Sequence, residues 1–159
     1  SLAGIAVLIL GLYILRRTMR KAKLRLAEQE RQIAQKNEQL RKMQERLQNE
    51  RFLFVTQIQT IIEAHLNDSD FDINKLAREM CMSRTGLYNK LQEAVGKTPN
   101  ELISDMRLQK ATNLLKEAPE KSVAEIADLA GYNTVSYFIR CFSKRYGTTP
   151  SAYRKSLNS

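Results

Sequence analysis

CMSRTGLYNKLQEAVGKTP (residues 81–99) and GYNTVSYFIRCFSKRYGTTP (residues 131–150) are two copies of one pattern, and both end in Gly-x-Thr-Pro. Their apolar positions coincide at an offset of 50 residues before an expected turn and 51 residues after it. One residue is therefore inserted in the second turn. Because the chain contains one pattern twice, we expect it to form the same local structure twice.

Capping residues place two helices in each copy. Ser83 is a suitable N-cap in the first copy, and Asn133 or Thr134 in the second. Gly96 and Gly147 fall where helix C-caps favour glycine. Each copy thus predicts a helix-turn-helix unit, whose second helix can enter a major groove of DNA. We expect the units at residues 73–96 and 122–147.

Residues 99–117 separate the two units and predict a linker helix with one apolar face. Pro99 suits its first turn. The helix would be about 28 Å long, and successive major-groove faces on one side of B-DNA lie about 34 Å apart. A rigid helix of this length could hold two readers on adjacent turns of one duplex.

The net charge of +9 is unevenly distributed along the chain. Residues 16–51 carry 12 Lys and Arg against 5 Glu, whereas residues 52–159 carry 14 Lys and Arg against 12 Asp and Glu. Within the second region, residues 133–159 contain no acid. This acid-free stretch favours a surface that faces phosphates, whereas each basic residue taken singly is more typical of a solvated face.

The N-terminal region reads as a membrane helix followed by a basic cluster. Residues 2–15 have no charge, and residues 16–25 hold six basic residues and no acid. A Lys/Arg cluster after an apolar run is typical of the cytoplasmic flank of a membrane helix. Because residues 1–15 are short for a span and begin at Ser1, we expect a truncated transmembrane helix and a chain cut from a longer one.

The connector at residues 16–51 predicts a long helix and a parallel coiled-coil dimer. An apolar residue recurs every seventh position, at Leu12, Met19, Leu26, Ile33, Leu40, Leu47, Phe54 and Ile61. The dimerisation seam is expected at Leu26, Ile33, Leu40 and Leu47. The second seam of the heptad is polar, so a single helix with a solvated face is the alternative. Beyond the connector, Phe52, Val55, Ile58, Ile62 and Leu66 are expected to pack on a globular core.

Enzyme and metal chemistry find little support in the sequence. No nucleophile–base set, glycine-rich phosphate loop or Cys/His cluster is visible, so we expect no catalytic residue, cofactor or metal. His65 is the only histidine, and it reads as a surface or boundary residue. Cys81 and Cys141 suit a reducing compartment and buried thiols.

Residues 52–156 resemble the AraC/XylS-type DNA-binding domain. The resemblance rests on R-L-x-x-A at residues 107–111, I-A-x-x-x-G-Y at 126–132 and Y-F-x-R-x-F at 137–142. It implies an all-α domain at residues 52–159 with seven helices, two helix-turn-helix units and regulation of transcription at a promoter. Duplex DNA is then the expected partner, and the resemblance leaves room for a contact with RNA polymerase.

The resemblance also assigns DNA contacts, residue by residue. The first reading helix would present Arg84, Thr85, Tyr88 and Asn89, and the second Thr134, Val135, Ser136, Ile139 and Arg140, followed by Lys144 and Arg145 on the phosphate side. Asn89 could bond adenine, and Arg140 could bond guanine or phosphate. Val135 and Ile139 depart from the family pattern, where base readers at these positions are often polar.

The sequence as a whole predicts a dimeric transcription regulator anchored in the bacterial inner membrane, with its DNA-binding domain in the cytoplasm. A sensor outside this stretch of chain would pass its state along the helix. The alternative is a membrane-anchored helix-turn-helix adaptor that binds a protein instead of DNA, since a fold alone does not fix function.

Overall fold

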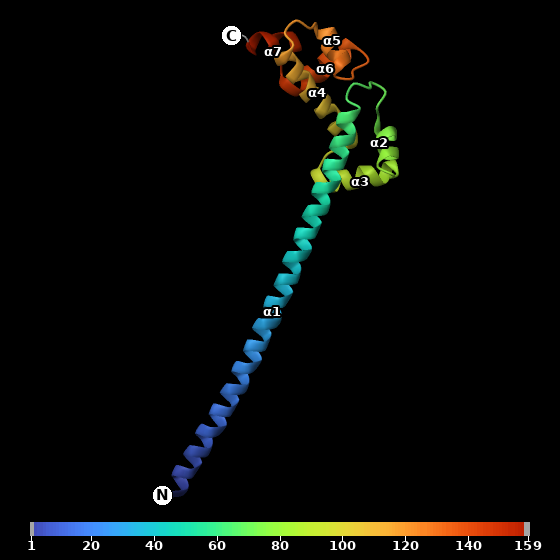
Figure 1. The fold of residues 1–159 in the computed structure, drawn as a ribbon. Helices are drawn as coiled ribbons and strands as arrows, with labels where there is room; N and C mark the ends of the chain where they lie inside the picture. Colours follow the sequence, from blue (N-terminus) through green and yellow to red (C-terminus); the bar gives the residue numbers. More distant parts are fainter. Residues whose placement is uncertain (1, 158–159) are drawn as a thin grey trace. The chain divides into compact units, whose positions relative to one another are not determined.

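The computed structural model describes residues 2–157, which form seven α-helices and no strand (Figure 1). The helices are α1 (Leu2–Ala64), α2 (Ile73–Glu79), α3 (Arg84–Val95), α4 (Pro99–Glu117), α5 (Val123–Leu129), α6 (Val135–Tyr146) and α7 (Pro150–Leu157). The predicted all-α fold is confirmed. The chain divides into two compact units, residues 1–50 and residues 51–159, and each is described by itself.

The first unit is a single stretch of α1 whose described side chains are all exposed. Leu26, Ile33, Leu40 and Leu47 of the heptad stripe are each 55–58% exposed. Arg41 bridges Glu38 at 2.9 Å and Glu45 at 2.8 Å along the same helix. Near its N-terminus, α1 also carries one stretch that is long and apolar enough to cross a membrane.

The second unit contains two apolar cores along α4. The first core joins the C-terminal part of α1 to α2, α3 and the start of α4, and Ile58, Leu87 and Leu91 lie fully buried at its centre. Phe54 is buried there, and the ammonium group of Lys90 lies 4.4 Å from the centre of its ring. Phe52, which the spacing assigned to this core, is instead 67% exposed.

The second core joins the rest of α4 to α5, α6 and α7 and is rich in aromatic side chains. Phe138 and Phe142 are fully buried at its centre, with ring centroids 5.6 Å apart. Tyr132 packs on Phe138 at 5.1 Å, and Tyr153 of α7 packs on Phe142 at 5.5 Å. Each helix-turn-helix unit therefore has its own core, and α4 contributes side chains to both.

The turns of the two units repeat one hydrogen-bond pattern. The residue after each turn, Met82 or Tyr132, donates its backbone N–H to the carbonyl of Ala77 or Ala127, at 2.9 Å in both cases. This pattern needs a left-handed residue in each turn, namely Cys81 with φ +52° and Gly131 with φ +78°. The expectation of buried thiols is wrong for Cys81, which is exposed, while Cys141 is half-buried.

Side-chain caps fix where the helices begin. Ser83 accepts from Gly86 N at 3.0 Å before α3, and Thr134 accepts from Tyr137 N at 3.3 Å before α6. Thr134, rather than Asn133, is therefore the N-cap of the second reading helix. The helices α4 and α5 each begin with a reciprocal capping box.

Candidate nucleic-acid interface

The first reading helix, α3, turns one apolar face to the core and leaves its polar face free. All four predicted contact residues, Arg84, Thr85, Tyr88 and Asn89, are exposed. Since Leu87 and Leu91 are buried, the 3.6-residue period places Thr85 and Asn89 on the opposite face. A hollow of about 440 Å³ opens beside the start of this helix between Ile73, Arg84, Thr85 and Tyr88.

The second reading helix, α6, presents fewer of its predicted contact residues. Ser136 and Arg140 are exposed, and Val135 is 37% exposed. Ile139 is half-buried against the second core. The hydroxyl of Thr134 is used as a helix cap. The polar reading surface of α6 is therefore narrower than that of α3.

Tyr137 is exposed at 51%, and its ring supports Arg140. The guanidinium carbon of Arg140 lies 5.1 Å from the centroid of the Tyr137 ring, a distance typical of a cation–π contact. The equivalent position in the first unit, 51 residues earlier, is Gly86. The guanidinium of Arg140 on α6 therefore packs on an aromatic ring, and α3 has no aromatic ring at the equivalent position.

The predicted phosphate-facing basic residues are not all directed to one surface. Lys144 is exposed. The Nε atom of Arg145 instead lies 3.7 Å from the carboxylate of Asp105 on α4, which also bridges Lys97 at 2.6 Å. Arg154 donates to the carbonyl of Pro119 at 3.5 Å. The absence of acidic residues from 133–159 therefore does not leave every basic side chain of this stretch free to contact phosphate.

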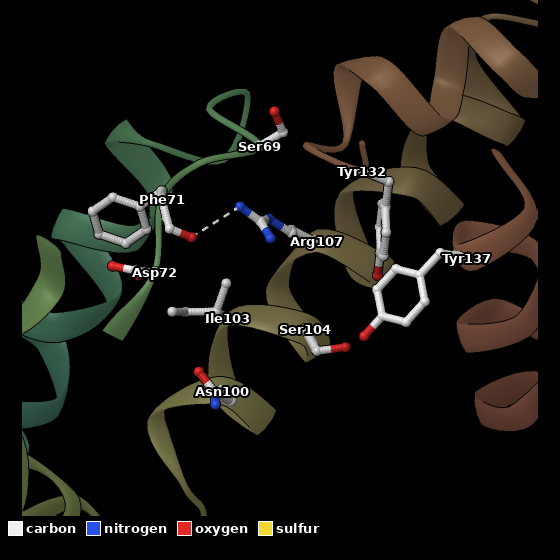
Figure 2. Close-up of a pocket in the computed structure, with 9 residues that line it drawn as sticks. All are labelled: Ser69, Phe71, Asp72, Asn100, Ile103, Ser104, Arg107, Tyr132 and Tyr137. Carbon is white, nitrogen blue, oxygen red and sulfur yellow. Dashed lines mark hydrogen bonds between the residues drawn. The ribbon is translucent and has the colours of Figure 1, made fainter. Parts of the chain in front are cut away.

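A cavity of about 310 Å³ lies between the loop that leads into the first helix-turn-helix unit, the linker helix α4 and the second helix-turn-helix unit. It is lined by Ser69, Phe71, Asp72, Asn100, Ile103, Ser104, Arg107, Tyr132 and Tyr137 (Figure 2). The guanidinium of Arg107 lies in it between Phe71 on one side and the two tyrosine rings on the other. The lining residues come from the loop before α2, from α4 and from the second helix-turn-helix unit. We call this space the inter-unit cavity.

Arg107 ties the loop before α2 to the linker helix. Its Nη2 atom donates to the carbonyls of Asp68 at 2.8 Å and Phe71 at 3.2 Å. Gly131 packs against the same place, because a Cβ there would lie 2.2 Å from the carbonyl oxygen of Leu66 and 2.9 Å from Arg107 Nε. The loop, α4 and the second turn therefore meet at one arginine.

Burial changes the acid–base properties of Arg107 and Tyr132 in the inter-unit cavity. Desolvation lowers the pKa of Arg107, although it stays far above neutrality and the guanidinium keeps its charge. Desolvation also raises the pKa of Tyr132 to about 12, and the nearby Ser104 hydroxyl offsets only part of this rise. Arg107 Nε and Tyr132 Oη are buried without a hydrogen-bond partner among the described residues.

Sequence reasoning did not assign the inter-unit cavity. In the sequence, Arg107 and Tyr132 stand out only as parts of the family pattern. One signal was present, namely an arginine on the apolar face of a helix that needs a partner when it is buried. Within residues 2–157, no group of three or more His, Cys, Asp or Glu is placed to hold a metal.

Comparison with known proteins gives matches over part of this chain. The profile of a helix-turn-helix domain family matches residues 76–156, just over half of the chain. The chain is 35% identical to histidine kinase P4 of Formosa agariphila over 94 residues, and 33% identical to the HTH-type transcriptional regulator MtrA of Neisseria gonorrhoeae over 88 residues. These matches cover 59% and 55% of this chain but only 7% and 29% of the two relatives.

A solved structure of the DNA-binding domain of AdpA, a global transcriptional factor in complex with a target DNA, is also similar. The TM-score is 0.60 at 26% identity, and the match covers 64% of this chain and 89% of that chain. The similarity therefore comprises nearly the whole of that isolated domain.

Proposed function

The chain belongs to the AraC-type helix-turn-helix family, and on this premise we propose that it is a sequence-specific DNA-binding regulator of transcription. The observation that carries the proposal is the repetition of one capped helix with polar side chains at equivalent exposed positions. Thr85 and Asn89 on α3 correspond to Ser136 and Arg140 on α6. Two such helices joined by one linker helix can contact successive major-groove segments.

In this proposal the two reading helices make different kinds of contact with DNA. Asn89 reads a base, because a carboxamide matches the major-groove edge of adenine, and Arg84, Thr85 and Tyr88 surround it. Arg140 contacts phosphate, because Val135 and Ile139 beside it offer no polar group for base edges. The first helix-turn-helix unit therefore supplies most of the sequence preference. The second helix-turn-helix unit positions the protein on the duplex and adds affinity.

The connector makes the regulator a membrane-anchored dimer in this proposal. The heptad stripe leaves four large apolar side chains more than half exposed in a single chain, and pairing two such stripes would cover them. The apolar stretch before the basic cluster would anchor the dimer in the bacterial inner membrane, with residues 51–159 in the cytoplasm. Two anchored copies raise each other's effective concentration at paired sites.

The first experiment selects binding sites from a pool of random duplex DNA with the whole chain in detergent micelles. The selected sites are then re-measured at several salt concentrations. We expect an enriched motif with two half-sites about one helical turn apart and a steep salt dependence. Absence of any enriched motif, together with negligible affinity at low salt, would contradict DNA binding and favour the adaptor.

The dimer is tested by replacing Ile33 and Leu40 together with Asp. Two charges in the heptad stripe should separate the helices, because a coiled-coil seam needs apolar side chains. The variant should bind paired sites with weaker cooperativity and bind a single site with unchanged affinity. Glu30→Asp and Gln44→Asn, at polar positions of the same helix, serve together as the matched control. Unchanged cooperativity in the Asp variant would contradict the dimer.

A further inference from the structure

The basic cluster at the start of the connector has no acidic partner among the described residues. Its six side chains are exposed, and the first acid in this sequence is Glu28. None of the six makes an ion pair with a described residue, whereas Arg41 farther along α1 bridges two glutamates. Like charges three or four residues apart destabilise a helix, so counter-charge from outside the chain would stabilise this one. The cluster consists of Arg16, Arg17, Arg20, Lys21, Lys23 and Arg25.

The helical period sorts these six charges into two rows on α1. Arg16, Arg20 and Lys23 share one face of the helix. Leu15 and Met19 lie beside this row, and the five side chains together line a surface hollow of about 360 Å³. The hollow therefore has a cationic side and an apolar side, and we call it the cationic hollow. The outer row, on another face, consists of Arg17, Lys21 and Arg25.

The combination of charge and apolar surface matches an anionic phospholipid. Leu15 ends the uncharged stretch of residues 2–15, so the cationic hollow lies where that stretch meets the first charges. Basic residues at this place next to a membrane helix attract anionic headgroups. Leu8 and Leu12, both exposed, continue the apolar side of the hollow along the helix. A DNA backbone would supply the negative charge but no apolar surface for Leu15 and Met19.

The cationic hollow also lies on the proposed dimer seam. Met19 belongs to the heptad stripe, and Arg16 and Lys23, three residues before it and four after it, occupy the second seam position of the heptad. In a parallel dimer the same residues of the two copies face each other, so these cations would meet their own equivalents. Like charges placed together oppose association, and an anion between them removes the repulsion.

We propose that the cationic hollow binds the headgroup of an anionic phospholipid, with Arg16, Arg20 and Lys23 around the phosphate and an acyl chain along Leu12 and Leu15. The bound headgroups allow two copies to pair at the membrane end of the heptad stripe. This inference rests on the membrane-anchored dimer proposed above and deepens it, because pairing then depends on the lipid composition of the membrane.

The first test measures which lipid lies next to the cationic hollow. The chain has no tryptophan, so Tyr13→Trp places a single fluorophore three residues before Arg16, at a level where membrane proteins often carry tryptophan. The whole chain is reconstituted in vesicles of phosphatidylcholine with a minor fraction of phosphatidylglycerol. One lipid at a time is brominated, because bromine quenches tryptophan on contact. We expect phosphatidylglycerol to be enriched about tenfold over phosphatidylcholine at the tryptophan.

Two triple variants with the same loss of charge separate a site from general attraction to an anionic surface. In the hollow variant, glutamine replaces Arg16, Arg20 and Lys23 together. In the outer-row variant, glutamine replaces Arg17, Lys21 and Arg25 together. Glutamine preserves the helix in both. The hollow variant should lose most of the enrichment, and the outer-row variant should keep most of it. Equal losses in the two variants, or no enrichment without them, would overturn the lipid site.

The second test measures pairing in the same vesicles by energy transfer between chains labelled at the exposed thiol of Cys81. Transfer should rise with the fraction of phosphatidylglycerol in the wild-type chain and in the outer-row variant. The hollow variant should pair to the same extent at every lipid composition, because its seam has lost the cations that repel. Wild-type pairing that ignored lipid composition would overturn the role of the headgroup in pairing.

The remaining outcomes show which proposal fails. If neither brominated lipid quenches the tryptophan, the membrane anchor and the lipid site are overturned together. If the chains pair in no vesicle, the dimer is overturned, and the enrichment still decides the lipid site. Loss of the enrichment on adding duplex DNA would assign the cationic hollow to DNA, and the same loss with glycerol phosphate would assign it to a free phosphate. Either result would overturn lipid binding, whereas selection of DNA sites in detergent tests DNA binding separately.

Discussion

The two helix-turn-helix units share their helix lengths and turn hydrogen bonds, apart from one residue inserted in the second turn, but their side chains differ in packing and in exposed contacts. Their turn hydrogen bonds agree in length, and both second helices end at a left-handed glycine. The first unit has an aliphatic core around Leu87 and Leu91, whereas the second has an aromatic core around Phe138 and Phe142. Two copies of one helix-turn-helix arrangement are therefore stabilised by two different sets of core side chains.

The left-handed position of the turn shows what the difference means. Cys81 occupies it in the first unit, at an exposed place where a side chain fits despite the positive φ. Gly131 occupies it in the second unit, pressed against the carbonyl of Leu66 and against Arg107. The first turn faces solvent, and the second turn is part of the junction that holds the two units together.

The largest effect is expected from Gly131→Ala. The new Cβ would lie 2.2 Å from the Leu66 oxygen, a distance that requires the backbone to move, and φ is unfavourable as well. We expect the free energy of unfolding to fall by at least about 3 kcal/mol, measured by urea denaturation. The control is Gly96→Ala, where φ is +67° but nothing lies within 4 Å, so only about 1 kcal/mol is lost. Equal losses would contradict a packed second turn.

The next effect concerns Asn89 and Arg140, which occupy equivalent positions on the reading helices. Asn89→Ala should weaken binding by about 1–3 kcal/mol and relax the preference at one base pair. Arg140→Ala should weaken binding to all sequences and lower the slope of log affinity against log salt by about 1. Binding to the selected site and its single-base variants at several salt concentrations separates the two. A base-specific loss for Arg140→Ala would mean that both units read sequence.

Local signals in the sequence were enough to predict the helices. Ser83, Gly96 and Gly147 act through neighbours within one turn, so the predicted caps are those found. The choice between Phe52 and Phe54 depended on the direction from which the core approaches α1, which spacing alone does not specify. Both lie within helical reach of Ile58, and only Phe54 is buried.

The candidate site was predictable only where it follows helix periodicity. Exposure of Thr85, Asn89 and Arg140 follows from the apolar face opposite them. The inter-unit cavity joins residues up to 68 positions apart, from Ser69 to Tyr137, and no local pattern brings them together. The pairing of Arg145 with Asp105 likewise depends on how α6 packs on α4.

A smaller effect of opposite sign is expected from Cys81→Gly. Glycine adopts positive φ without the clash of a Cβ, so it relieves strain in the first turn. The side chain is exposed and contributes little packing. We expect the free energy of unfolding to rise by roughly 0.5–1 kcal/mol in urea denaturation. Cys81→Ala keeps the strain and should leave stability unchanged, and a gain equal to that of Cys81→Gly would show that the thiol, not φ, is the cause.

The smallest effect compares how the first helices of the two units begin. Asp72 caps α2, and the N–H groups of the first turn, with Lys75 foremost, lower the pKa of its carboxyl. Ser122 caps α5, and Glu125 completes the box; its bonds to Ser122, backbone N–H first, lower the pKa of Glu125. A carboxyl whose pKa falls on folding stabilises the folded state at neutral pH and loses this contribution as pH drops through the lowered pKa.

Asp72→Asn and Glu125→Gln each keep the cap and remove the charge. At neutral pH both variants should therefore keep nearly the stability of wild type. As pH falls from about 5 to 2, their free energies of unfolding should decline less steeply than that of wild type. Asp72 accepts from the N–H groups of Asn74 and Lys75, whereas Glu125 accepts from the N–H of Ser122, so similar flattening would show that a carboxylate at either position of the cap produces the acid response. Flattening in only one variant would assign that response to the side chains in which the units differ.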